Sequence, residues 1–494
     1  MLAAVITARN YEQAVVDIGK CKSADAIEIR LDYMDNLKNK ELEKLIMTSS
    51  KPVIITCRKY GSNPFVKDET KRIGILKDSV NLGADYIDIE YDAGEKSINA
   101  LIKNKKSAKI IVSYHNFKET PSNIAQVFEN IKKLNPDLIK IATNANSVTD
   151  NFKIFELINA AKKGKDRVIA FCMGPYGQFS RILSVILGSQ LTYSSVEYGK
   201  ESADGQLTLS DMCDIYRIKK LSKKTRIAGL IGNPVEHSWS HIMHNAAFDS
   251  LGIDAVYLKF KVDKLKEFIE YFKKLNILGF SVTIPHKIEI IKYLDSIDKK
   301  AKAIGAVNTV AVKNGQLIGH NTDCDGAIMA LKAKTKLNSK KAVVLGAGGS
   351  SRALTYGLIE NGAKVAVLNR TLEKARMQAE YFNCDYGHLD ELKNMEYDIL
   401  INTIPVGMYP DSDRSPIPLR LIKSGSVVFD IIFNPFRTKL LKYAESKKCI
   451  TVYGFEMLIN GAALQFKLWT GKNPSKSLMR KKVMERLRND IHKN

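Results

Sequence analysis

Short apolar runs alternate with amphipathic, charged stretches along roughly the first 215 residues of the chain. The runs are five to seven residues long and rich in β-branched residues, which is typical of buried strands. The stretches between them, such as 124–134 and 151–164, place their apolar residues on one side of a helix. Strands that alternate with helices predict a parallel sheet, and eight such units predict a closed (β/α)8 barrel of the TIM type. The eight predicted strands are residues 2–8, 26–32, 52–58, 85–90, 109–115, 138–142, 167–173 and 191–196.

A second alternating pattern begins after a polar, basic stretch at 217–226, RIKKLSKKTR, which we interpret as a linker. Within this pattern, residues 340–371 are predicted to form a strand, a glycine-rich turn, a helix and a strand. Strands at 397–403 and 426–432 continue a second parallel sheet, and a helix over 455–471 ends at a glycine. The predicted fold is therefore α/β throughout. The predicted domains are a barrel (1–216), a linker (217–226), a smaller α/β domain (227–330), a Rossmann domain (331–454) and C-terminal helices that return to the smaller domain (455–494).

The charge balance is strongly basic, with a formal net charge of +23 and a pI near 9.4. Such a charge is compatible with nucleic-acid binding. The lysines, however, are spread along the chain rather than clustered with aromatic residues, and no nucleic-acid-binding motif is present. We therefore predict that the partners are small anionic molecules and not nucleic acid. The sequence leaves the oligomeric state open.

Nothing in the sequence predicts a membrane partner or export. No stretch approaches the ~18 uninterrupted apolar residues of a membrane span, and the N-terminus lacks the pattern of a signal peptide. The seven cysteines are scattered and include no CxxC pair, which is typical of reduced thiols. These features predict a cytoplasmic protein.

The segment GAGGSS, at residues 346–351, follows a predicted strand and begins a predicted helix. Glycines in this context let the backbone approach a pyrophosphate at the N-terminus of the helix. At the end of the next strand, where an NAD enzyme usually carries Asp or Glu, this chain has Asn-Arg-Thr. An arginine can pair with a 2′-phosphate, so we predict NADP as the cofactor; a solvated residue at the start of a helix is the alternative interpretation of this arginine. The predicted cofactor-binding residues are Gly346, Ala347, Gly348, Gly349, Ser350, Asn369, Arg370 and Thr371.

Four polar motifs lie between the linker and the glycine-rich loop: HSWS, TIPHK, GAVNT and HNTDCDG. Each follows an apolar strand, where binding residues collect. Ser238 and Ser240 are small hydroxyls suited to a carboxylate. Lys287 and Asp323 are candidates for the lysine–carboxylate pair that donates a proton during ketone reduction. Three histidines in and after HSWS do not form an HExxH-type motif, and we predict no metal.

Residues 226–475 resemble shikimate dehydrogenases through HSWS, SVTIPHK, GAVNT, GHNTDC, GAGGSSRA, NRT, TIPVGM and GAALQF. The resemblance implies that paired serines hold the carboxylate of shikimate, that a lysine and an aspartate form the catalytic pair, and that three polar residues bind ring hydroxyls. This chain departs from the family pattern at His241, where proline is usual, and at Ser281, where asparagine is usual. The implied catalytic pair is Lys287 and Asp323, and the implied substrate-binding residues are Ser238, Ser240, Thr283, Asn308 and Gln465.

One predicted barrel strand, LIKIA at 138–142, carries Lys140 inside an apolar run. Burial of an unpaired ammonium costs several kcal/mol (order of magnitude), so such a lysine needs a physical reason. Polar residues at the ends of the other strands converge on the face where barrel enzymes carry out their chemistry. A structural ion pair is the alternative interpretation of the lysine. The polar residues at this face are Glu28, Arg30, Arg58, Glu90, His115 and, in the following loop, Arg181.

These residues favour covalent chemistry. Burial and nearby guanidinium groups favour a neutral lysine, and a neutral amine can attack a ketone to form an imine. The imine acidifies the adjacent carbon, and His115 is placed to move that proton.

Residues 1–215 resemble type I 3-dehydroquinate dehydratases through EIRLD, TCR, GADYIDIE, SYHNF, IKIAT, CMGPYGQFSR and SADGQ. The resemblance implies that Lys140 forms a Schiff base and that His115 acts as general base and then as general acid, so that 3-dehydroquinate loses water. The glutamate that often partners the histidine in this family is replaced by Ser62, and the usual SAPGQ contains Asp204 in place of proline. The resemblance implies that ring hydroxyls are held by Glu28, Arg30 and Arg58, and the carboxylate by Arg181, Ser202 and Gln206.

The two resemblances belong to consecutive steps of the shikimate pathway, in the order of the plant-type bifunctional enzymes. They imply conversion of 3-dehydroquinate to 3-dehydroshikimate and then NADPH-dependent reduction to shikimate. Three alternatives stay open. One is an active dehydrogenase with an impaired or scaffold dehydratase half, which only the Ser62 position supports. The others are a different Schiff-base lyase or aldolase fused to an NADP reductase, and a basic nucleic-acid-binding regulator.

Overall fold

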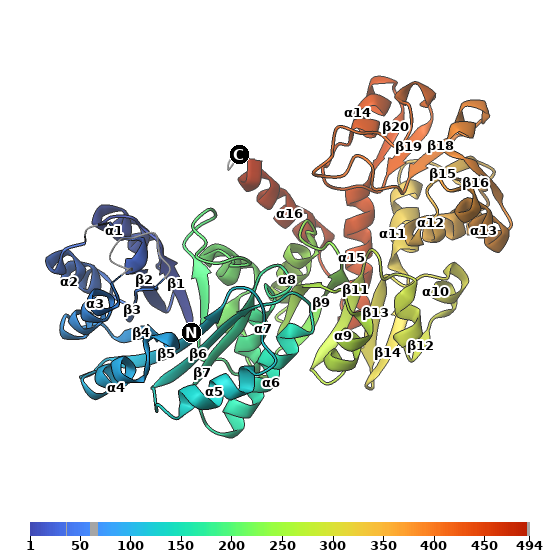
Figure 1. Cartoon of the computed structure of the whole chain (residues 1–494). Coiled ribbons are helices and arrows are strands. Elements are labelled where there is room, and N and C mark those ends of the chain that lie inside the picture. The colour runs from blue at the N-terminus through green and yellow to red at the C-terminus, as the bar shows by residue number, and fades with distance from the viewer. Residues whose placement is uncertain (36, 60–67, 492–494) are drawn as a thin grey trace. The chain divides into compact units, whose positions relative to one another are not determined.

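The computed structural model describes residues 1–35, 37–59 and 68–491. By its internal contacts the chain divides into two compact units (Figure 1). The first consists of Met1–Arg226 together with Asp254–Val256 and Phe260–Asn276. The second consists of the remaining described residues.

The first unit contains, within the described residues, a parallel sheet of eight strands in the order β7-β6-β5-β4-β3-β2-β1-β8. Strand β8 pairs with β1, so β7 and β8 are the two edge strands of this sheet. These edges approach each other: the N–H of Gln190, just before β8, donates to the carbonyl of Val168 in β7 at 2.9 Å. The predicted (β/α)8 architecture is confirmed, as a nearly closed barrel. The strands are β1 (Leu2–Ile6), β2 (Ala26–Arg30), β3 (Val53–Thr56), β4 (Tyr86–Glu90), β5 (Lys109–Asn116), β6 (Leu138–Asn144), β7 (Val168–Met173) and β8 (Thr192–Ser195).

Amphipathic helices connect the strands and lie outside the barrel (Figure 1). In α5, for example, Ile124, Phe128 and Ile131 recur at spacings of four and three and are buried. Asn10 caps α1 by accepting a hydrogen bond from the N–H of Gln13 at 2.9 Å. The helices are α1 (Tyr11–Lys20), α2 (Asn39–Thr48), α3 (Glu69–Asn81), α4 (Glu95–Lys103), α5 (Ile124–Lys132), α6 (Asp150–Lys163) and α7 (Ser180–Leu187).

The interior of the barrel changes from apolar to polar along the strands. Alternate residues of each strand point inward, and Ala26, Ile54 and Leu138 belong to one buried apolar cluster. Two residues further along the same inward faces come polar groups such as Glu28 and Lys140. The carboxyl ends of the strands therefore surround a polar chamber, on the face where barrel enzymes place their sites.

The second unit contains a mixed sheet in the order β10-β9-β11-β13-β14-β12. Strand β11 runs parallel to β9 and antiparallel to β13, which continues into β14 as a hairpin. Residues 254–256 and 260–276, which include most of β10 and all of α9, are grouped with the first unit. The elements are β9 (Arg226–Gly232), α8 (Ser240–Ser250), β10 (Ala255–Lys261), α9 (Leu265–Phe272), β11 (Ile277–Val282), β12 (Ser296–Ile297), α10 (Lys299–Ile304), β13 (Thr309–Lys313) and β14 (Gln316–His320).

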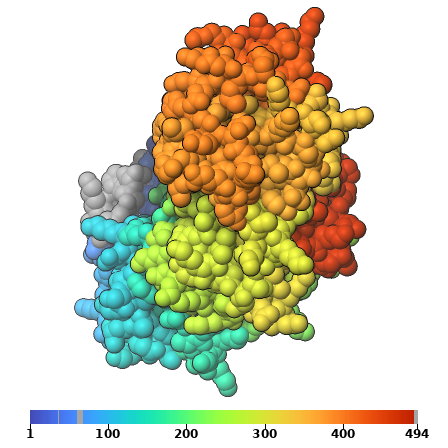
Figure 2. Space-filling view, turned by 90° about the vertical axis from the view of Figure 1, so that its right-hand side faces the viewer, coloured from blue at the N-terminus to red at the C-terminus, as the bar shows by residue number. Residues whose placement is uncertain are grey.

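The other sheet of the second unit is parallel, with the order β17-β16-β15-β18-β19-β20, which is the Rossmann order. Figure 2 shows the lobe that carries this sheet in orange and the lobe that carries the mixed sheet in yellow-green. The predicted Rossmann fold is confirmed. The elements are β15 (Lys341–Leu345), α12 (Gly349–Glu360), β16 (Lys364–Asn369), α13 (Leu372–Phe382), β17 (Asp385–His388), β18 (Ile399–Asn402), β19 (Val427–Asp430), α14 (Lys439–Ser446) and β20 (Ile450–Tyr453).

Two helices that pack against each other, α11 (Thr322–Lys332) and α15 (Gly454–Thr470), lie between the two lobes of this unit (Figure 1). Their close approach requires a glycine, because a Cβ on Gly326 would lie 2.9 Å from the carbonyl oxygen of Met457. Helix α15 ends at Gly471, whose φ of 73° suits glycine. Helix α16 (Lys476–Ile491) follows. Of the helices that the structure describes, none has the length and apolar character needed to cross a bilayer.

Candidate active sites

A cavity of about 440 Å³ opens at the carboxyl ends of the barrel strands. It is formed by a polar chamber above the apolar interior and by the loops that follow β7 and β8. The structure brings together at this cavity all the barrel residues predicted from the sequence: Glu28, Arg30, Arg58, Glu90, His115, Lys140, Arg181, Ser202 and Gln206.

Lys140 lies in β6 with 3% of its surface exposed. Its Nζ donates to Asp88 Oδ2 at 2.9 Å and to Glu28 Oε1 at 3.4 Å. The same atom lies 4.0 Å from the centroid of the Tyr193 ring, in a cation–π contact. We expected cationic neighbours to dominate the surroundings of this lysine; instead, two carboxylates contact its Nζ.

Asp88 is the centre of this network, and the sequence analysis did not identify it. It is buried in β4 and accepts hydrogen bonds from Arg58 Nη2 at 2.9 Å and from Ser113 Oγ at 2.6 Å, in addition to Lys140. Burial by itself would raise the pKa of Asp88, but the charges of Arg58 and Lys140 outweigh it and hold that pKa well below its ordinary value. The signal was present in DYIDIE, where Tyr86, Asp88 and Glu90 alternate and therefore share the inward face.

His115 lies in β5, two residues beyond Ser113, which is paired in register with Lys140. The two side chains of β5 therefore point into the same chamber. Burial, together with the charges of Arg58 and Lys140, holds the pKa of His115 well below its ordinary value, so the imidazole is neutral. Its Nδ1 is buried and has no hydrogen-bond partner within residues 1–35, 37–59 and 68–491.

Ser62, the position at which the family often carries a glutamate, lies outside the described residues. The segment that contains it, YGSNPFVK at 60–67, includes no Asp or Glu. Glu69 follows this segment, and its carboxylate is engaged by Arg72 in a two-pronged pair with distances of 2.9 and 2.7 Å.

Two other predicted cations of the barrel site, Arg30 and Arg181, differ in whether a carboxylate binds them. Arg30 forms a two-pronged pair with Asp32 at 2.9 and 2.7 Å. Arg181 is buried, lies 4.6 Å from the centroid of Phe171, and donates to the carbonyl of Asp204 at 3.3 Å. Burial lowers the pKa of Arg181 to about 10. Its Nε has no partner among the described residues, so this guanidinium is free to bind an anion.

Two further predicted residues of the barrel bind each other. The Oε1 of Gln206 accepts from the N–H of Ser202 at 2.7 Å and from its hydroxyl at 3.2 Å. Both residues line the cavity, as does Ala203 between them in the chain. The carbonyl of Asp204, between these two residues in the chain, accepts from Arg181, so this loop contacts the guanidinium.

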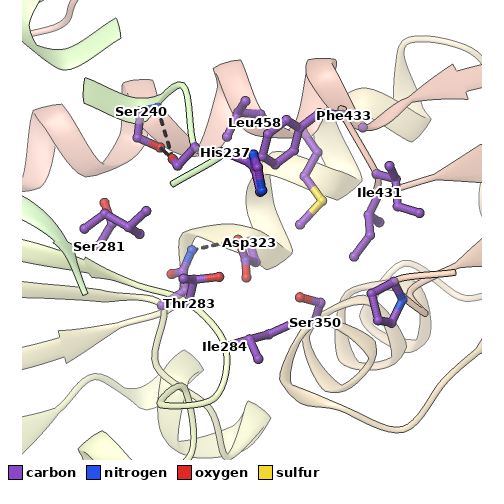
Figure 3. Close-up of a pocket in the computed structure, with 18 of the residues that line it drawn as sticks. His237, Ser240, Ser281, Thr283, Ile284, Asp323, Ser350, Ile431, Phe433 and Leu458 are labelled. Carbon is purple, nitrogen blue, oxygen red and sulfur yellow. Dashed lines mark hydrogen bonds between the residues drawn. The ribbon is translucent and has the colours of Figure 1, made fainter. Parts of the chain in front are cut away.

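The second unit carries a cavity of about 290 Å³. In Figure 3, Ser240, Ser281 and Thr283 lie on one side of it, Ser350 and Ile431 lie on the other, and Asp323 lies between them. The predicted residues that the structure places on its wall are Ser238, Ser240, Thr283, Lys287, Asn308, Asp323, Ser350 and Gln465.

Lys287 and Asp323 are paired, with 2.5 Å between Nζ and Oδ2. Asp323 lies in the first turn of α11, where the helix dipole favours a carboxylate. Its Oδ1 accepts from Asn308 Nδ2 at 2.7 Å, and the same amide is bound to Thr322. Lys287 also donates to Ser350 Oγ at 3.0 Å, which brings the lysine to the start of α12.

Ser238 and Ser240 are joined at the start of α8, where the hydroxyl of Ser238 donates to that of Ser240 at 3.1 Å (Figure 3). On the neighbouring wall, Ser281 donates to Gln465 Oε1 at 2.8 Å and accepts from the Tyr257 hydroxyl at 2.8 Å. Ser281, which the sequence analysis treated only as a departure from the family pattern, therefore orients one of the predicted binding residues.

The glycine-rich loop connects β15 to α12 in the predicted way. Gly346 has a φ of 108°, and a Cβ there would lie 2.5 Å from Thr403 Oγ1, so only glycine fits. A Cβ on Gly348 would meet no atom within 4 Å, which leaves open space at the N-terminus of the helix. At the end of β16, Asn369 donates to the carbonyl of Thr371 at 2.9 Å and Arg370 is exposed. These residues fit a dinucleotide with a 2′-phosphate.

The three histidines considered as metal ligands are dispersed. His237 lines the cavity and lies 5.1 Å from Tyr409, ring centroid to centroid. His241 is in α8, and His244 stacks on Tyr257 at 4.5 Å inside the core. The part of the chain that the structure describes contains no cluster of three or more His, Cys, Asp or Glu side chains arranged to hold a metal ion.

Comparisons with known proteins match both units. Family profiles match in chain order: type I 3-dehydroquinase at residues 2–223, the shikimate dehydrogenase substrate binding domain at 230–310, shikimate / quinate 5-dehydrogenase at 328–406, and the shikimate 5′-dehydrogenase C-terminal domain at 454–484. A bifunctional 3-dehydroquinate dehydratase/shikimate dehydrogenase of Arabidopsis thaliana, described as chloroplastic, is 36% identical over 97% of this chain and 83% of its own length. The chain belongs to this family of bifunctional dehydratase/dehydrogenases.

Further relatives match the dehydrogenase half of this bifunctional family member. The NADP⁺-dependent shikimate dehydrogenase of Methanococcus maripaludis is 46% identical over 54% of this chain and 100% of its own length. A solved shikimate dehydrogenase of Thermus thermophilus, in complex with NADP(H) and shikimate, has a TM-score of 0.50 and 34% identity, and covers 53% of this chain and 99% of its own. The family predicted from the sequence is confirmed.

Proposed function

We propose that this chain dehydrates 3-dehydroquinate to 3-dehydroshikimate in its first unit and reduces 3-dehydroshikimate to shikimate with NADPH in its second. The observation that carries the proposal is that each unit holds a lysine, with a polar partner suited to one of these steps, on the wall of a cavity. Lys140 lines the barrel cavity together with His115, and Lys287 pairs with Asp323 beside the glycine-rich loop.

In the dehydratase, Lys140 Nζ reacts in its deprotonated form, because only the neutral amine carries the lone pair that attacks the ketone carbon of the substrate and forms the Schiff base. The resulting imine acidifies the neighbouring C–H, and the neutral His115 takes that proton. His115 then returns the proton to the departing hydroxyl, which leaves as water. Hydrolysis of the imine by water finally releases 3-dehydroshikimate and restores the amine of Lys140. Asp88 and Glu28 hold the lysine in place by accepting hydrogen bonds from its Nζ, and Arg58 in turn donates to Asp88.

The carboxylate of 3-dehydroquinate pairs with Arg181, whose guanidinium lacks a carboxylate partner among the described residues. Ser202 and Gln206, on the loop above it, complete this end of the site. Glu28, Arg30 and Arg58 hold the ring hydroxyls at the opposite end. The two ends thereby fix the ketone beside Lys140.

In the dehydrogenase, NADPH supplies the hydride when bound, and its pyrophosphate is held by the loop of Gly346, Ala347, Gly348, Gly349 and Ser350. Lys287, paired with Asp323, donates a proton to the ketone oxygen as it becomes a hydroxyl. Asn308 fixes the orientation of Asp323, and Arg370 with Asn369 and Thr371 holds the 2′-phosphate.

The substrate of the second unit is anchored at both ends. Ser238 and Ser240 hold its carboxylate through their hydroxyls. Thr283, Asn308 and Gln465 bind the ring hydroxyls, and Ser281 supports Gln465. We therefore propose small anions as the partners of this enzyme. We also propose that it is cytoplasmic and that its domains divide at the boundaries predicted from the sequence.

A second candidate function is an active dehydrogenase joined to a weakened dehydratase. The observation that favours it is the buried Nδ1 of His115, which has no hydrogen-bond partner among the described residues. The sequence of residues 60–67, where the family often carries the partner glutamate, contains no Asp or Glu. A histidine without an orienting partner is a less effective proton shuttle.

Reciprocal substitution of the two lysines tests the proposal. Lys140→Met keeps the apolar stem and removes the amine, so dehydration should fall by about 10³-fold or more while reduction is unchanged. Lys287→Met should lower the rate at which 3-dehydroshikimate is reduced by about 10²–10⁴-fold and leave the rate of dehydration unchanged. Separate assays of the two reactions measure both effects. Loss of both activities in either variant, with the fold retained, would contradict two independent sites.

A further inference from the structure

A tyrosine in the barrel holds a buried hydroxyl for which the fold provides no hydrogen bond. Tyr193 lies in β8 with 2% of its surface exposed, and its hydroxyl has no partner within the described residues. A buried, unsatisfied hydroxyl costs about 1–3 kcal/mol, whereas phenylalanine would fill the same space without this cost. Stability alone therefore does not explain the hydroxyl.

The ring of Tyr193 is fixed in the site by its neighbours. It lines the cavity, and Lys140 Nζ lies 4.0 Å from its centroid. The Phe171 ring packs against it at 6.0 Å with an interplanar angle of 57°. The phenol oxygen lies on the axis about which the ring flips, so flipping does not move it. The hydroxyl therefore has one position, at the edge of a ring whose face the amine contacts.

The hydroxyl stays protonated. Burial raises the pKa of Tyr193 well above its ordinary value, and the nearby charges of Glu28 and Asp88 add to this effect while Arg58 opposes it. A neutral phenol is a hydrogen-bond donor. Glu28 and Asp88 accept instead from Lys140, Thr56, Arg58 and Ser113, which leaves the phenol proton available to a bound molecule.

We propose that the Tyr193 hydroxyl donates a hydrogen bond to the ketone oxygen of the substrate while Lys140 Nζ attacks the ketone carbon, an inference that rests on the proposed dehydratase function. As the N–C bond forms, the π pair of the carbonyl moves to oxygen, where the phenol stabilises the developing negative charge. The nitrogen then loses a proton and the oxygen gains one, giving the carbinolamine. The oxygen leaves as water when the C=N bond forms, and Tyr193 keeps its own proton throughout.

The test is Tyr193→Phe in the full-length chain, with Tyr86→Phe as a matched control. Tyr86 also lies on a barrel strand and packs against the same apolar cluster, but it does not line the cavity. In a single turnover with 3-dehydroquinate, borohydride traps the imine, and mass spectrometry follows its formation over time. We expect Tyr193→Phe to slow formation of the trapped adduct about 100-fold, a typical loss for one oxyanion donor.

Two further readouts separate this role from a structural one. The melting temperature of Tyr193→Phe should equal or exceed that of the wild type, because an unsatisfied hydroxyl is removed. Its rate of 3-dehydroshikimate reduction should be unchanged, as should both rates of Tyr86→Phe. An adduct that forms in Tyr193→Phe at the wild-type rate would overturn the inference. Absence of any trapped adduct in the wild type would instead overturn the proposed dehydratase function, and with it this inference.

Discussion

Asp88 balances the charge around Lys140. Two cations, Arg58 and Lys140, contact its carboxylate, and all three side chains are buried. Loss of one member of such a buried group leaves an uncompensated charge, which costs more than the whole group contributes. The carboxylate therefore serves the fold of the site as well as its chemistry.

At the same residue we predict a large effect on stability. Asp88→Asn should lower the free energy of barrel unfolding by about 3–5 kcal/mol. Both tryptophans, Trp239 and Trp469, lie in the second unit, so their fluorescence does not report on the barrel. Hydrogen exchange of peptides from β4, β5 and β6 measures the effect instead.

Asp92→Asn is the control for this measurement. Asp92 is half exposed and lies 3.9 Å from Lys59, so its loss should change the free energy of unfolding by less than about 0.5 kcal/mol. Equal exchange rates for the Asp88 and Asp92 variants would show that the buried network does not support the barrel.

His115 determines the predicted pH dependence of dehydration. A general base must be unprotonated, and a pKa held below its ordinary value keeps His115 in that form as the pH falls. The acid limb of kcat/KM, which reports the free enzyme, should therefore lie below the ordinary histidine value of about 6.5. A dehydratase pH profile with its acid limb at or above pH 6.5 would contradict this assignment.

Much of the barrel site could be predicted from single residues of the sequence. The exception is Asp88. Lys140 is conspicuous because a charge interrupts an apolar run, and His115 ends a strand. Asp88 is separated from Glu90 by one residue, so its inward direction follows from the alternation of the strand. Its pairing with Arg58 and Lys140 depends on the register of β4 with its neighbours, which no local pattern specifies.

At the scale of elements, buried strands were predicted more reliably than exposed ones. The eight barrel strands lie within one or two residues of their predicted bounds because most of them are short apolar runs between charged, helical stretches. Strands β12, β14, β17 and β20 were not predicted. Strand β17 is largely exposed at one edge of its sheet, and β14 alternates in an antiparallel hairpin, so neither forms an apolar run.

The end of β16 determines cofactor preference in our account. Arg370→Ala removes the cation assigned to the 2′-phosphate, and charge-assisted hydrogen bonds contribute about 1.5–3 kcal/mol. The KM for NADPH should rise about 10–100-fold, and the KM for NADH should change little. Steady-state reduction with each nucleotide measures the two constants.

The control is Arg376→Ala in α13, because Arg376 is exposed and paired with Glu373 rather than placed at the strand end. It should leave both KM values unchanged. An equal rise of the NADPH and NADH constants in Arg370→Ala would contradict the role of Arg370 in holding the phosphate.

At the scale of the whole molecule, the two units divide a reaction sequence between two independent cavities. Each cavity is lined by residues of its own unit, and each contains a lysine and at least one group suited to bind a carboxylate. A net charge of +23 suits anionic substrates, although the charge alone did not separate them from nucleic acid. The motifs at the strand ends made that distinction, because they place side chains suited to catalysis and to carboxylate binding at the same end of each sheet.

The central claim is that one chain carries out both steps in order. The most direct measurement supplies the purified full-length protein with 3-dehydroquinate and NADPH and follows 3-dehydroquinate, 3-dehydroshikimate and shikimate by mass spectrometry. We predict that shikimate forms with one NADPH oxidised per molecule, and that without NADPH the reaction stops at 3-dehydroshikimate. Persistence of 3-dehydroquinate, while added 3-dehydroshikimate is still reduced, would contradict the account.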